Sequence, residues 1–576
     1  MDSSTSIADR VFRNAKVYSV SLDDTVTRAE AVAVADGKIV YVGTNEGSQA
    51  FIGEKTEVTD CKGNTILPGF GDGHMHISLS VNRYGGVRLY DLKEGGPVQE
   101  PEFYIAEIQK RLKAYAEENP DKPTILGGGF DRQWFDGTLS GIVRPITRKD
   151  LDAAVSDRPV VIDSYCGHVC LFNSKALEVA GLLHTGVEQI PGGEIRLGED
   201  GIPDGFVLET AAIYAIKERI PSSTWGKEDK HKAILLALAD MAKEGITITS
   251  DYLYNKDGYE LLAEMAKNGE LTTRVSGSFI FYERTADADL AYAIEHMHDY
   301  DVDDLMKADA AKFFVDGIYA LFEPFSPETC KLMGWEEGYR GEMLWEEENL
   351  KKVAAATQKA GFHLHAHAMG DYAGDVAANA FSYARETEDK DGTKRNVIIH
   401  ISFMKEETKR KMAQAGLIAN IQPLWEGITR TGSASELVLL GEERFTTMYP
   451  NKSLMEKGIA VSYGTDFPVD PANTFGLLQK AMTRLPLPTD TQYELCKNDS
   501  AVNPAECTSL QQAIKAGTIN VAYELGIETI TGSIEVGKSA ELVLIDRDLE
   551  AVPVNKIYET KVLETLFKGK TVYKAE

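Results

Sequence analysis

Residues 67–76 of this chain read LPGFGDGHMH, an apolar run that passes three glycines and ends in two histidines one residue apart. The lead-in 65–67 is typical of a buried strand, and on a β-strand the side chains at i and i+2 point to the same face. We therefore expect His74 and His76 to converge, about 7 Å apart along the strand, as the start of a divalent metal site. A histidine pair packed in a core is the alternative interpretation.

The bulk composition is that of an ordinary globular protein. The chain has 576 residues, of which 43% are hydrophobic and 26% are charged, and this predicts one large domain with a smaller one, or three domains. The 61 basic and 89 acidic residues give a formal net charge of −28. Because nucleic acids and anionic membranes attract basic surfaces, we expect neither as a partner.

The first residues and the cysteines favour a cytoplasmic protein. The start MDSSTS has no basic n-region and no apolar run, so no signal peptide is expected. No apolar stretch approaches the roughly 18 residues that a membrane span requires. The six cysteines are scattered without zinc-knuckle spacing, which suits free thiols in a reducing compartment.

Both ends of the chain are predicted to form β-structure. Val11 to Val20 is expected to form one strand, and residues 31–43 have the pattern of a hairpin around Asp36-Gly37. Short strand-like runs near the C-terminus are 542–545, 562–563 and 571–573. We therefore expect one small β-domain built from both termini, residues 1–66 and 529–576.

The middle of the chain alternates apolar strand-like runs with helical stretches. The clearest runs are 160–163, 245–251, 312–317, 361–367, 397–400 and 459–466. This α/β pattern predicts a (β/α)8 barrel over residues 67–528, with an inserted subdomain at about 86–230 that is too long for one connection. A doubly wound open sheet is the alternative, although no Gly-x-Gly-x-x-Gly follows a strand. A last helix is expected from Thr508 to Leu525, with Gln511 completing a capping box.

Polar residues lie on or at the ends of these runs, and in a barrel function gathers at the carboxyl ends of the strands. These candidates for a one- or two-metal centre are His74, His76, Lys312, His367, His400 and Asp466. His363, His365 and His367 alternate and therefore face one way, so at most one or two of them can bind a metal. We favour His367, which is nearest the strand end.

The other candidates also have structural interpretations. His400 taken alone would be a core histidine, and Asp466 could cap a helix. Lys312 could form a buried salt bridge with Asp316 or Glu209, because an unpaired buried lysine is costly.

The inserted region contains glycines beside aromatic and polar residues, in 127-GGGFDRQW-134 and 166-CGH-168. Such segments suit loops that cover a pocket, and they also suit plain turns. We predict that Asp131, Trp134 and His168 contact the substrate.

Six motifs follow one another over nearly the whole chain. They are 67-LPGFGDGHMH-76, 173-NSKAL-177, Lys312-x-Phe314-x-Asp316-Gly317, 367-HAMGD-371, 464-GTDFPV-469 and 532-GSIEVGK-538. In this order they resemble the amidohydrolase superfamily, specifically the amidohydrolase-3 group of YtcJ-like metal-dependent hydrolases.

The resemblance implies a distorted TIM barrel with a β-sandwich formed by both termini. It implies a metal held by His74, His76, His367, His400 and Asp466. In the hydantoinase-like branch, a lysine on the fourth strand is carbamylated and bridges two metals, which suggests the same role for Lys312.

The expected reaction is hydrolysis of an amide-type or other C–N bond in an N-acyl amine, an N-formyl amine or a cyclic amide. One or two divalent ions would lower the pKa of a bound water toward 7, with zinc expected and manganese, iron or cobalt also compatible. Asp466 would accept the proton and deliver it to the leaving nitrogen, while His168 would hold the oxyanion.

Other reaction classes remain open at this point. A deaminase, an isomerase or a C–C lyase would use the same site, and a non-catalytic scaffold would keep the fold. The expected partner is a small-molecule substrate, and a homodimer is the working hypothesis for the assembly.

Overall fold

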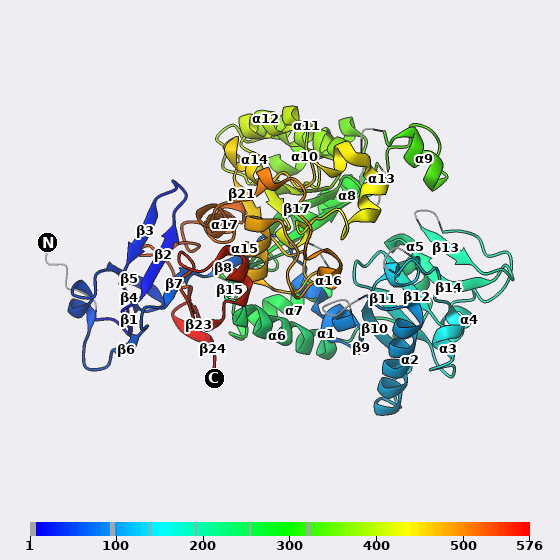
Figure 1. Cartoon of the computed structure of the whole chain (residues 1–576), viewed down its shortest axis with the longest axis horizontal. Helices are drawn as coiled ribbons and strands as arrows, with labels where there is room; N and C mark the ends of the chain where they lie inside the picture. The colour runs from blue at the N-terminus through cyan, green and yellow to red at the C-terminus, as the bar shows by residue number, and fades with distance from the viewer. Residues whose placement is uncertain are drawn as a thin grey trace. The chain divides into compact units, whose positions relative to one another are not determined.

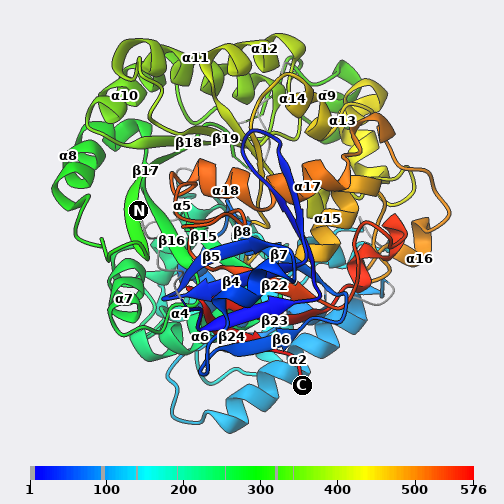
Figure 2. The same ribbon diagram turned by 90° about the vertical axis from the view of Figure 1, so that its left-hand side faces the viewer.

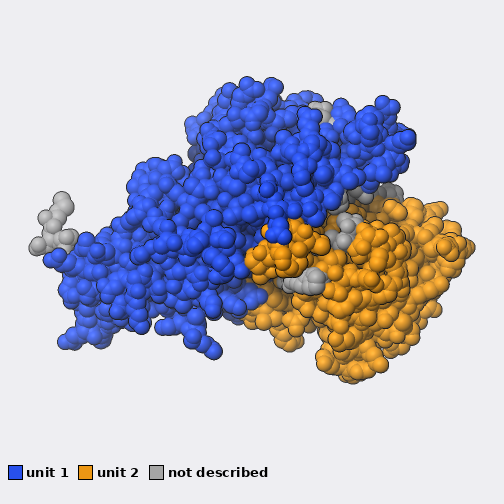
Figure 3. All heavy atoms as spheres, in the orientation of Figure 1, with its two compact units in different colours: residues 1–77, 238–487, 498–576 blue, residues 78–237, 488–497 orange. Residues whose placement is uncertain are grey.

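The computed structural model describes residues 7–92, 98–137, 140–190, 193–252, 255–317, 322, 324–341 and 343–576. The chain folds as two compact units (Figure 3). The first comprises residues 1–77, 238–487 and 498–576, and the second comprises 78–237 and 488–497. The domain limits 1–66, 67–528 and 529–576, with an insert at about 86–230, remain our proposal.

The first unit is built on an eight-stranded parallel sheet. In sheet order its strands are β8 (Phe70–Asp72), β15 (Ile246–Asp251), β16 (Arg274–Phe281), β17 (Met306–Phe314), β18 (His363–Ala368), β19 (Asn396–His400), β20 (Ile418–Ile421) and β21 (Val461–Tyr463). The first and last strands meet just past their carboxyl ends, where Gly73 N donates to Tyr463 O at 2.9 Å. The predicted barrel is confirmed, and the open doubly wound sheet is wrong.

Helices pack on the outer face of this sheet (Figures 1 and 2). In α11 (Asp371–Glu388), the buried residues Ala373, Val376, Ala377 and Phe381 recur at helical spacing and form the face toward the strands. Other helices of the unit are α7 (Lys256–Lys267), α8 (Ala286–His296), α9 (Pro327–Met333), α10 (Glu347–Lys359), α12 (Glu406–Ala415), α13 (Ala434–Phe445), α14 (Asn451–Glu456) and α15 (Thr474–Thr483). In sequence, α6 (Lys227–Lys243) crosses the limit between the two units.

The last helix is broken where one continuous helix was expected. The structure has α17 (Leu510–Ala516) and α18 (Ile519–Glu524), because Thr518 leaves helical geometry at ψ −94°. The capping box also lies one residue later than predicted, between Ser509 and Gln512. The last residue of α18 is the buried Glu524.

Strands from both termini share a β-sandwich in the same unit (Figure 2). One sheet is β5 (Lys38–Gly43), β4 (Ala31–Ala35), β1 (Arg10–Arg13) and β6 (Glu57–Asp60). The other is β24 (Lys570–Lys574), β23 (Val562–Phe567), β22 (Leu542–Ile545), β7 (Thr65–Pro68), β2 (Lys16–Val20) and β3 (Val26–Ala29). Side chains of both sheets, such as Val32 and Leu542, meet in one apolar core.

Two expectations about the N-terminal strands need correction. The single strand Val11–Val20 is in fact β1 and β2, which belong to different sheets, because Asn14 turns the chain with φ 53°. The lead-in to the histidine pair is β7, a sandwich strand, and the barrel strand β8 begins only at Phe70. The hairpin around Asp36-Gly37 is confirmed as β4 and β5.

The second unit contains a mixed six-stranded sheet. Its strands in order are β13 (Glu194–Leu197), β14 (Pro203–Leu208), β12 (Val169–Phe172), β11 (Val160–Ser164), β10 (Ile125–Phe130) and β9 (Val87–Arg88). Its helices are α1 (Ser80–Tyr84), α2 (Pro101–Glu118), α3 (Arg148–Asp152), α4 (Ser174–Val179), α5 (Thr210–Lys217) and α16 (Tyr493–Cys496). Two apolar clusters form its core, one with Ile108 of α2 and the other with Leu177 of α4.

Within the described part of the chain, no helix combines the length and the apolar character that crossing a membrane requires.

Candidate metal centre

His74 and His76 lie in the segment that follows β8, and not on the strand itself, which ends at Asp72. Hydrogen bonds from backbone amides hold this segment, since His76 N donates to Phe467 O at 2.7 Å and Met75 N donates to the Ser250 side-chain Oγ at 3.0 Å. The two imidazole rings nevertheless converge, with 5.1 Å between their centroids. The predicted convergence is therefore present, although a loop produces it.

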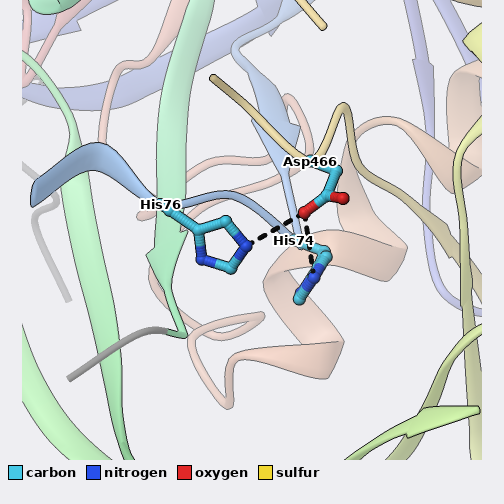
Figure 4. A group of neighbouring side chains, drawn as sticks. All are labelled: His74, His76 and Asp466. Atoms are coloured by element: carbon cyan, nitrogen blue, oxygen red, sulfur yellow. Dashed lines mark hydrogen bonds and ion pairs between the residues drawn. The ribbon is translucent and has the colours of Figure 1, made fainter. Parts of the chain in front are cut away.

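Asp466 meets both histidines from the loop after the eighth strand, β21 (Figure 4). Its Oδ1 lies 3.3 Å from His74 Nε2 and 3.0 Å from His76 Nε2. One ligand atom from each of the three residues lies within 4.8 Å of the others. The loops that follow β8 and β21 are packed closely together. Asp466 N donates to His74 O at 2.8 Å, and a Cβ on Gly464 would lie 2.7 Å from His74 N.

Asp72 ties the two ligand-bearing loops together, a role that sequence reasoning missed. Its carboxyl accepts hydrogen bonds from His74 N at 3.3 Å, from Thr465 N at 3.0 Å and from the Thr465 hydroxyl. Burial raises the pKa of Asp72 to about 7, although the bonds from Thr465 act in the opposite direction. The signal in the sequence was an acidic residue between two glycines directly before the histidine pair.

His400 ends the sixth strand, β19, and joins the same cluster. Its ring centroid lies 4.9 Å from that of His74 and 4.5 Å from that of His367. Trp425 stacks on it at 5.4 Å, and its Nδ1 lies 2.9 Å from Gln422 Oε1. His400 has φ 77°, a left-handed conformation that is uncommon outside glycine and that gathers at functional sites.

His367 approaches the end of the fifth strand and has a carboxylate behind it. His367 Nδ1 lies 2.8 Å from Asp316 Oδ1, and Asp316 also accepts from Met369 N and Gly370 N. A histidine that binds a metal through one nitrogen usually donates from the other to such a partner. The sequence had suggested Asp316 only as a partner of Lys312.

Lys312 lies on the fourth strand, β17, and is 1% exposed. Its Nζ is 5.8 Å from the ring centroid of Tyr252, and no described residue forms a salt bridge with it. Burial lowers the pKa of Lys312 to about 7, opposed by the charges of Asp466 and Glu524. The salt-bridge alternative is therefore wrong within the described residues, and with a pKa of about 7 roughly half of the lysine is neutral near pH 7.

The protonation states of the cluster fit a divalent ion. Burial and the charge of Lys312 hold the pKa of His74 well below its usual range, and burial does the same for His400. Burial alone would raise the pKa of Asp466, but hydrogen bonds from His74 and His76 hold it well below its usual range. Neutral imidazoles and an ionised carboxylate are the forms that metal binding requires.

The predicted substrate contacts lie in the second unit. Asp131 accepts from Gln133 N at 2.9 Å, and Trp134 is buried and stacks on Tyr104 at 4.3 Å. The His168 side chain is 35% exposed, and its Nδ1 lies 2.9 Å from Glu209 Oε2. Substrate binding by these three residues stays a prediction.

Comparisons with known proteins agree with this architecture. A family model described as the amidohydrolase family matches residues 57–573. An N-substituted formamide deformylase of Arthrobacter pascens is 24% identical over 579 residues, covering 98% of both chains. The putative amidohydrolase YtcJ of Bacillus subtilis (strain 168) is 24% identical over 562 residues, covering 95% of this chain and 96% of the relative. The structure of an uncharacterized metal-dependent hydrolase from Pyrococcus horikoshii OT3 aligns with a TM-score of 0.69 at 22% identity, covering 95% of this chain and 99% of that one.

Proposed function

The chain belongs to the amidohydrolase family and is a metal-dependent hydrolase of carbon–nitrogen bonds, and we propose that it hydrolyses an N-formyl or related N-acyl amine. The observation that carries the proposal is the meeting of His74 and His76 on one oxygen of Asp466. The N-formyl class is favoured by the formamide deformylase that matches over 98% of both chains. A cyclic amide is the other amide-type substrate that the same chemistry would serve.

His74, His76 and Asp466 would hold the ion, with His367 and His400 completing the site. The free ligand atom of His400 would be Nε2, since Nδ1 faces Gln422, and the same holds for His367, whose Nδ1 faces Asp316. Zinc fits this donor set, and one or two ions are compatible with the number of ligands. When bound, such an ion supplies a Lewis acid that polarises a carbonyl and lowers the pKa of water toward 7.

Asp466 moves the proton in this proposal. Asp466 is ionised, which is the form that can accept a proton from the attacking water. It then delivers that proton to the leaving nitrogen, which departs as the neutral amine. Asp466 has a positive φ of 59°, and its carboxylate lies beside both histidines.

His168 is our proposed contact to the substrate oxygen, with Asp131 and Trp134 shaping the same substrate region. Glu209 is paired with His168 and has φ 68° and ψ 142°, a conformation that a residue with a side chain rarely adopts. This strained glutamate orients the imidazole, which in our proposal donates a hydrogen bond to the developing negative charge.

Lys312 is proposed to carry a carbamate. The step joins the neutral amine to carbon dioxide, forming a C–N bond and releasing one proton from nitrogen. The low pKa of the buried amine favours this step, because a neutral amine is required. Carbon-13 spectra of protein supplied with labelled bicarbonate should show a carbamate signal that is missing in Lys312→Met.

The proposal also covers the location and the assembly of the protein. All six cysteines are free thiols, which supports a cytoplasmic location. A homodimer is the assembly that we propose to test by light scattering.

The experiment on function is a product analysis with metal-loaded protein. Matched N-formyl, N-acetyl and cyclic amides of the same amine should give the amine and formate from the first series at the highest rate. Release of ammonia from a ring would instead indicate a deaminase, and an isomeric product would indicate an isomerase. Either outcome, or no turnover of any amide, contradicts the proposal.

A further inference from the structure

A chain of hydrogen-bonded side chains starts at His400 and runs into the barrel. Gln422 Oε1 lies 2.9 Å from His400 Nδ1, and Gln422 Nε2 donates to Asn420 Oδ1 at 2.9 Å. Asn420 Nδ2 then donates to Glu524 Oε2 at 2.9 Å. All four side chains are buried, with exposed fractions of 2% or less. The chain therefore links a candidate metal ligand to a carboxyl group on α18.

Glu524, the last residue in this series of hydrogen bonds, determines which group donates and which accepts in each bond. Glu524 Oε2 faces two donors, Asn420 Nδ2 and the hydroxyl of Ser462, so it acts as an acceptor. The Asn420 amide must then turn its oxygen toward Gln422, and the Gln422 amide must turn its oxygen toward His400. His400 Nδ1 consequently carries the hydrogen, and its Nε2 keeps a lone pair for an ion.

Glu524 is costly to the fold where it lies. Its Oε1 is buried and has no hydrogen-bond partner among the described residues, which destabilises the folded state. Burial raises the pKa of Glu524 to about 8, against the bonds from Ser462 and Asn420. A costly buried carboxyl close to a candidate metal site is a candidate for a functional role.

The hydrogen-bonded side chains of Asn420 and Glu524 lie close to the segment that carries the histidine pair. A Cβ on Gly73 would lie 2.4 Å from Glu524 Oε2 and 2.6 Å from Asn420 Nδ2. Gly73 thus leaves room for the Glu524–Asn420 bond immediately before His74. The Glu524 carboxyl group therefore lies against Gly73, the residue before His74, although in the described part of the chain it forms no hydrogen bond or ion pair with a proposed ligand.

We propose that Glu524 is a positioning residue of the metal centre, which fixes the tautomer and ring orientation of His400 through Asn420 and Gln422. His367 has the equivalent support directly, from Asp316 at 2.8 Å. Two neighbouring ligands are thus oriented by carboxyl groups, one in contact and one through two amides. The inference rests on the proposed function in taking His400 as a ligand.

The test uses two substitutions of Glu524 that differ in hydrogen bonding. Glu524→Leu removes the acceptor, so the amides lose their fixed direction, and metal affinity should fall about 10- to 100-fold. Glu524→Gln keeps an acceptor oxygen for Asn420 and should restore most of the affinity. Affinity is measured by competition with a chelator, and the His400 tautomer is read from nitrogen-15 spectra of metal-free protein.

Glu244→Leu is the matched control. Glu244 also has a pKa raised to about 7 by burial, and its carboxyl accepts from Thr474 N at 3.1 Å, outside the chain to His400. This variant should change stability and leave metal affinity and the His400 tautomer unchanged. If Glu524→Leu does not fold, Asn420→Leu interrupts the same chain and is read in the same way.

The outcomes separate this inference from the proposed function. A weaker metal site with both His400 tautomers present in Glu524→Leu, and recovery in Glu524→Gln, supports the inference. Wild-type affinity and a single Nδ1–H tautomer in Glu524→Leu overturn it, while the proposed function stands. A wild-type protein that binds no divalent ion overturns both.

Discussion

Strand β18 carries three histidines on one face, and the histidines at its two ends have different hydrogen-bond partners. At the carboxyl end, Asp316 fixes Nδ1 of His367, and the ring lies 4.5 Å from that of His400. At the other end, Nδ1 of His363 accepts a hydrogen bond from Arg395 N at 2.8 Å, and its Nε2 lies 4.0 Å from Asp309. In our proposal the ring at the carboxyl end uses Nε2 to bind an ion, whereas the ring at the start of the strand has only a structural role. Position along the strand, and not residue type, decides the role.

The largest expected effect is at the carboxyl end. Asp466→Asn should lower kcat by about 10²- to 10⁴-fold, because the amide cannot accept and return the proton. Most of the bound metal should remain, since the four histidines still hold it, although Asp466 is itself a proposed ligand. The measurement is steady-state turnover of an N-formyl amine together with metal content, and near-normal turnover would remove Asp466 from its proposed role.

A smaller effect is expected from changing the carboxylates next to the histidines at the two ends of β18. Asp316→Asn should weaken metal affinity about 10- to 100-fold, because His367 loses the partner that orients it. Asp309→Asn, beside His363, should leave affinity unchanged. Chelator competition on both variants measures the difference, and equal losses would show that the two ends do not differ.

The smallest expected effect is on the pH dependence of stability, through His363 at the start of β18. Burial lowers the pKa of His363 in the folded state, although the charge of Asp309 acts in the opposite direction. The unfolded chain therefore binds more protons below about pH 6.5, and the stability linked to a neutral His363 is lost as the pH falls through that range. His363→Gln should lose less stability than wild type between pH 7 and pH 5, by on the order of 1 kcal/mol. Urea unfolding of the metal-free proteins tests this, and parallel pH curves would contradict it.

Much of the site was predictable because it follows from strand periodicity. Two rules, alternation along a strand and function at the carboxyl ends, were enough to select His367 over His363 and to place His400 in the same group. The structure brings these rings together with His74 and Asp466. The barrel itself followed from repeated strand and helix patterns.

The remainder depends on contacts between distant segments. Asn420 and Glu524 are 104 residues apart, and nothing in either local sequence indicates that they meet. The backbone conformation of single residues was equally unpredictable from the sequence. The positive φ of Asn14, for example, divides one apparent strand between two sheets. Such features depend on tertiary packing, which a single sequence does not show.

The most direct test of the account is elemental analysis of purified wild-type protein beside His74→Ala and His363→Ala. We expect about one or two equivalents of a divalent ion in the wild type and in His363→Ala, and a loss of the ion in His74→Ala. A wild-type protein without a divalent ion, or a His74→Ala variant that retains the full content, would contradict it.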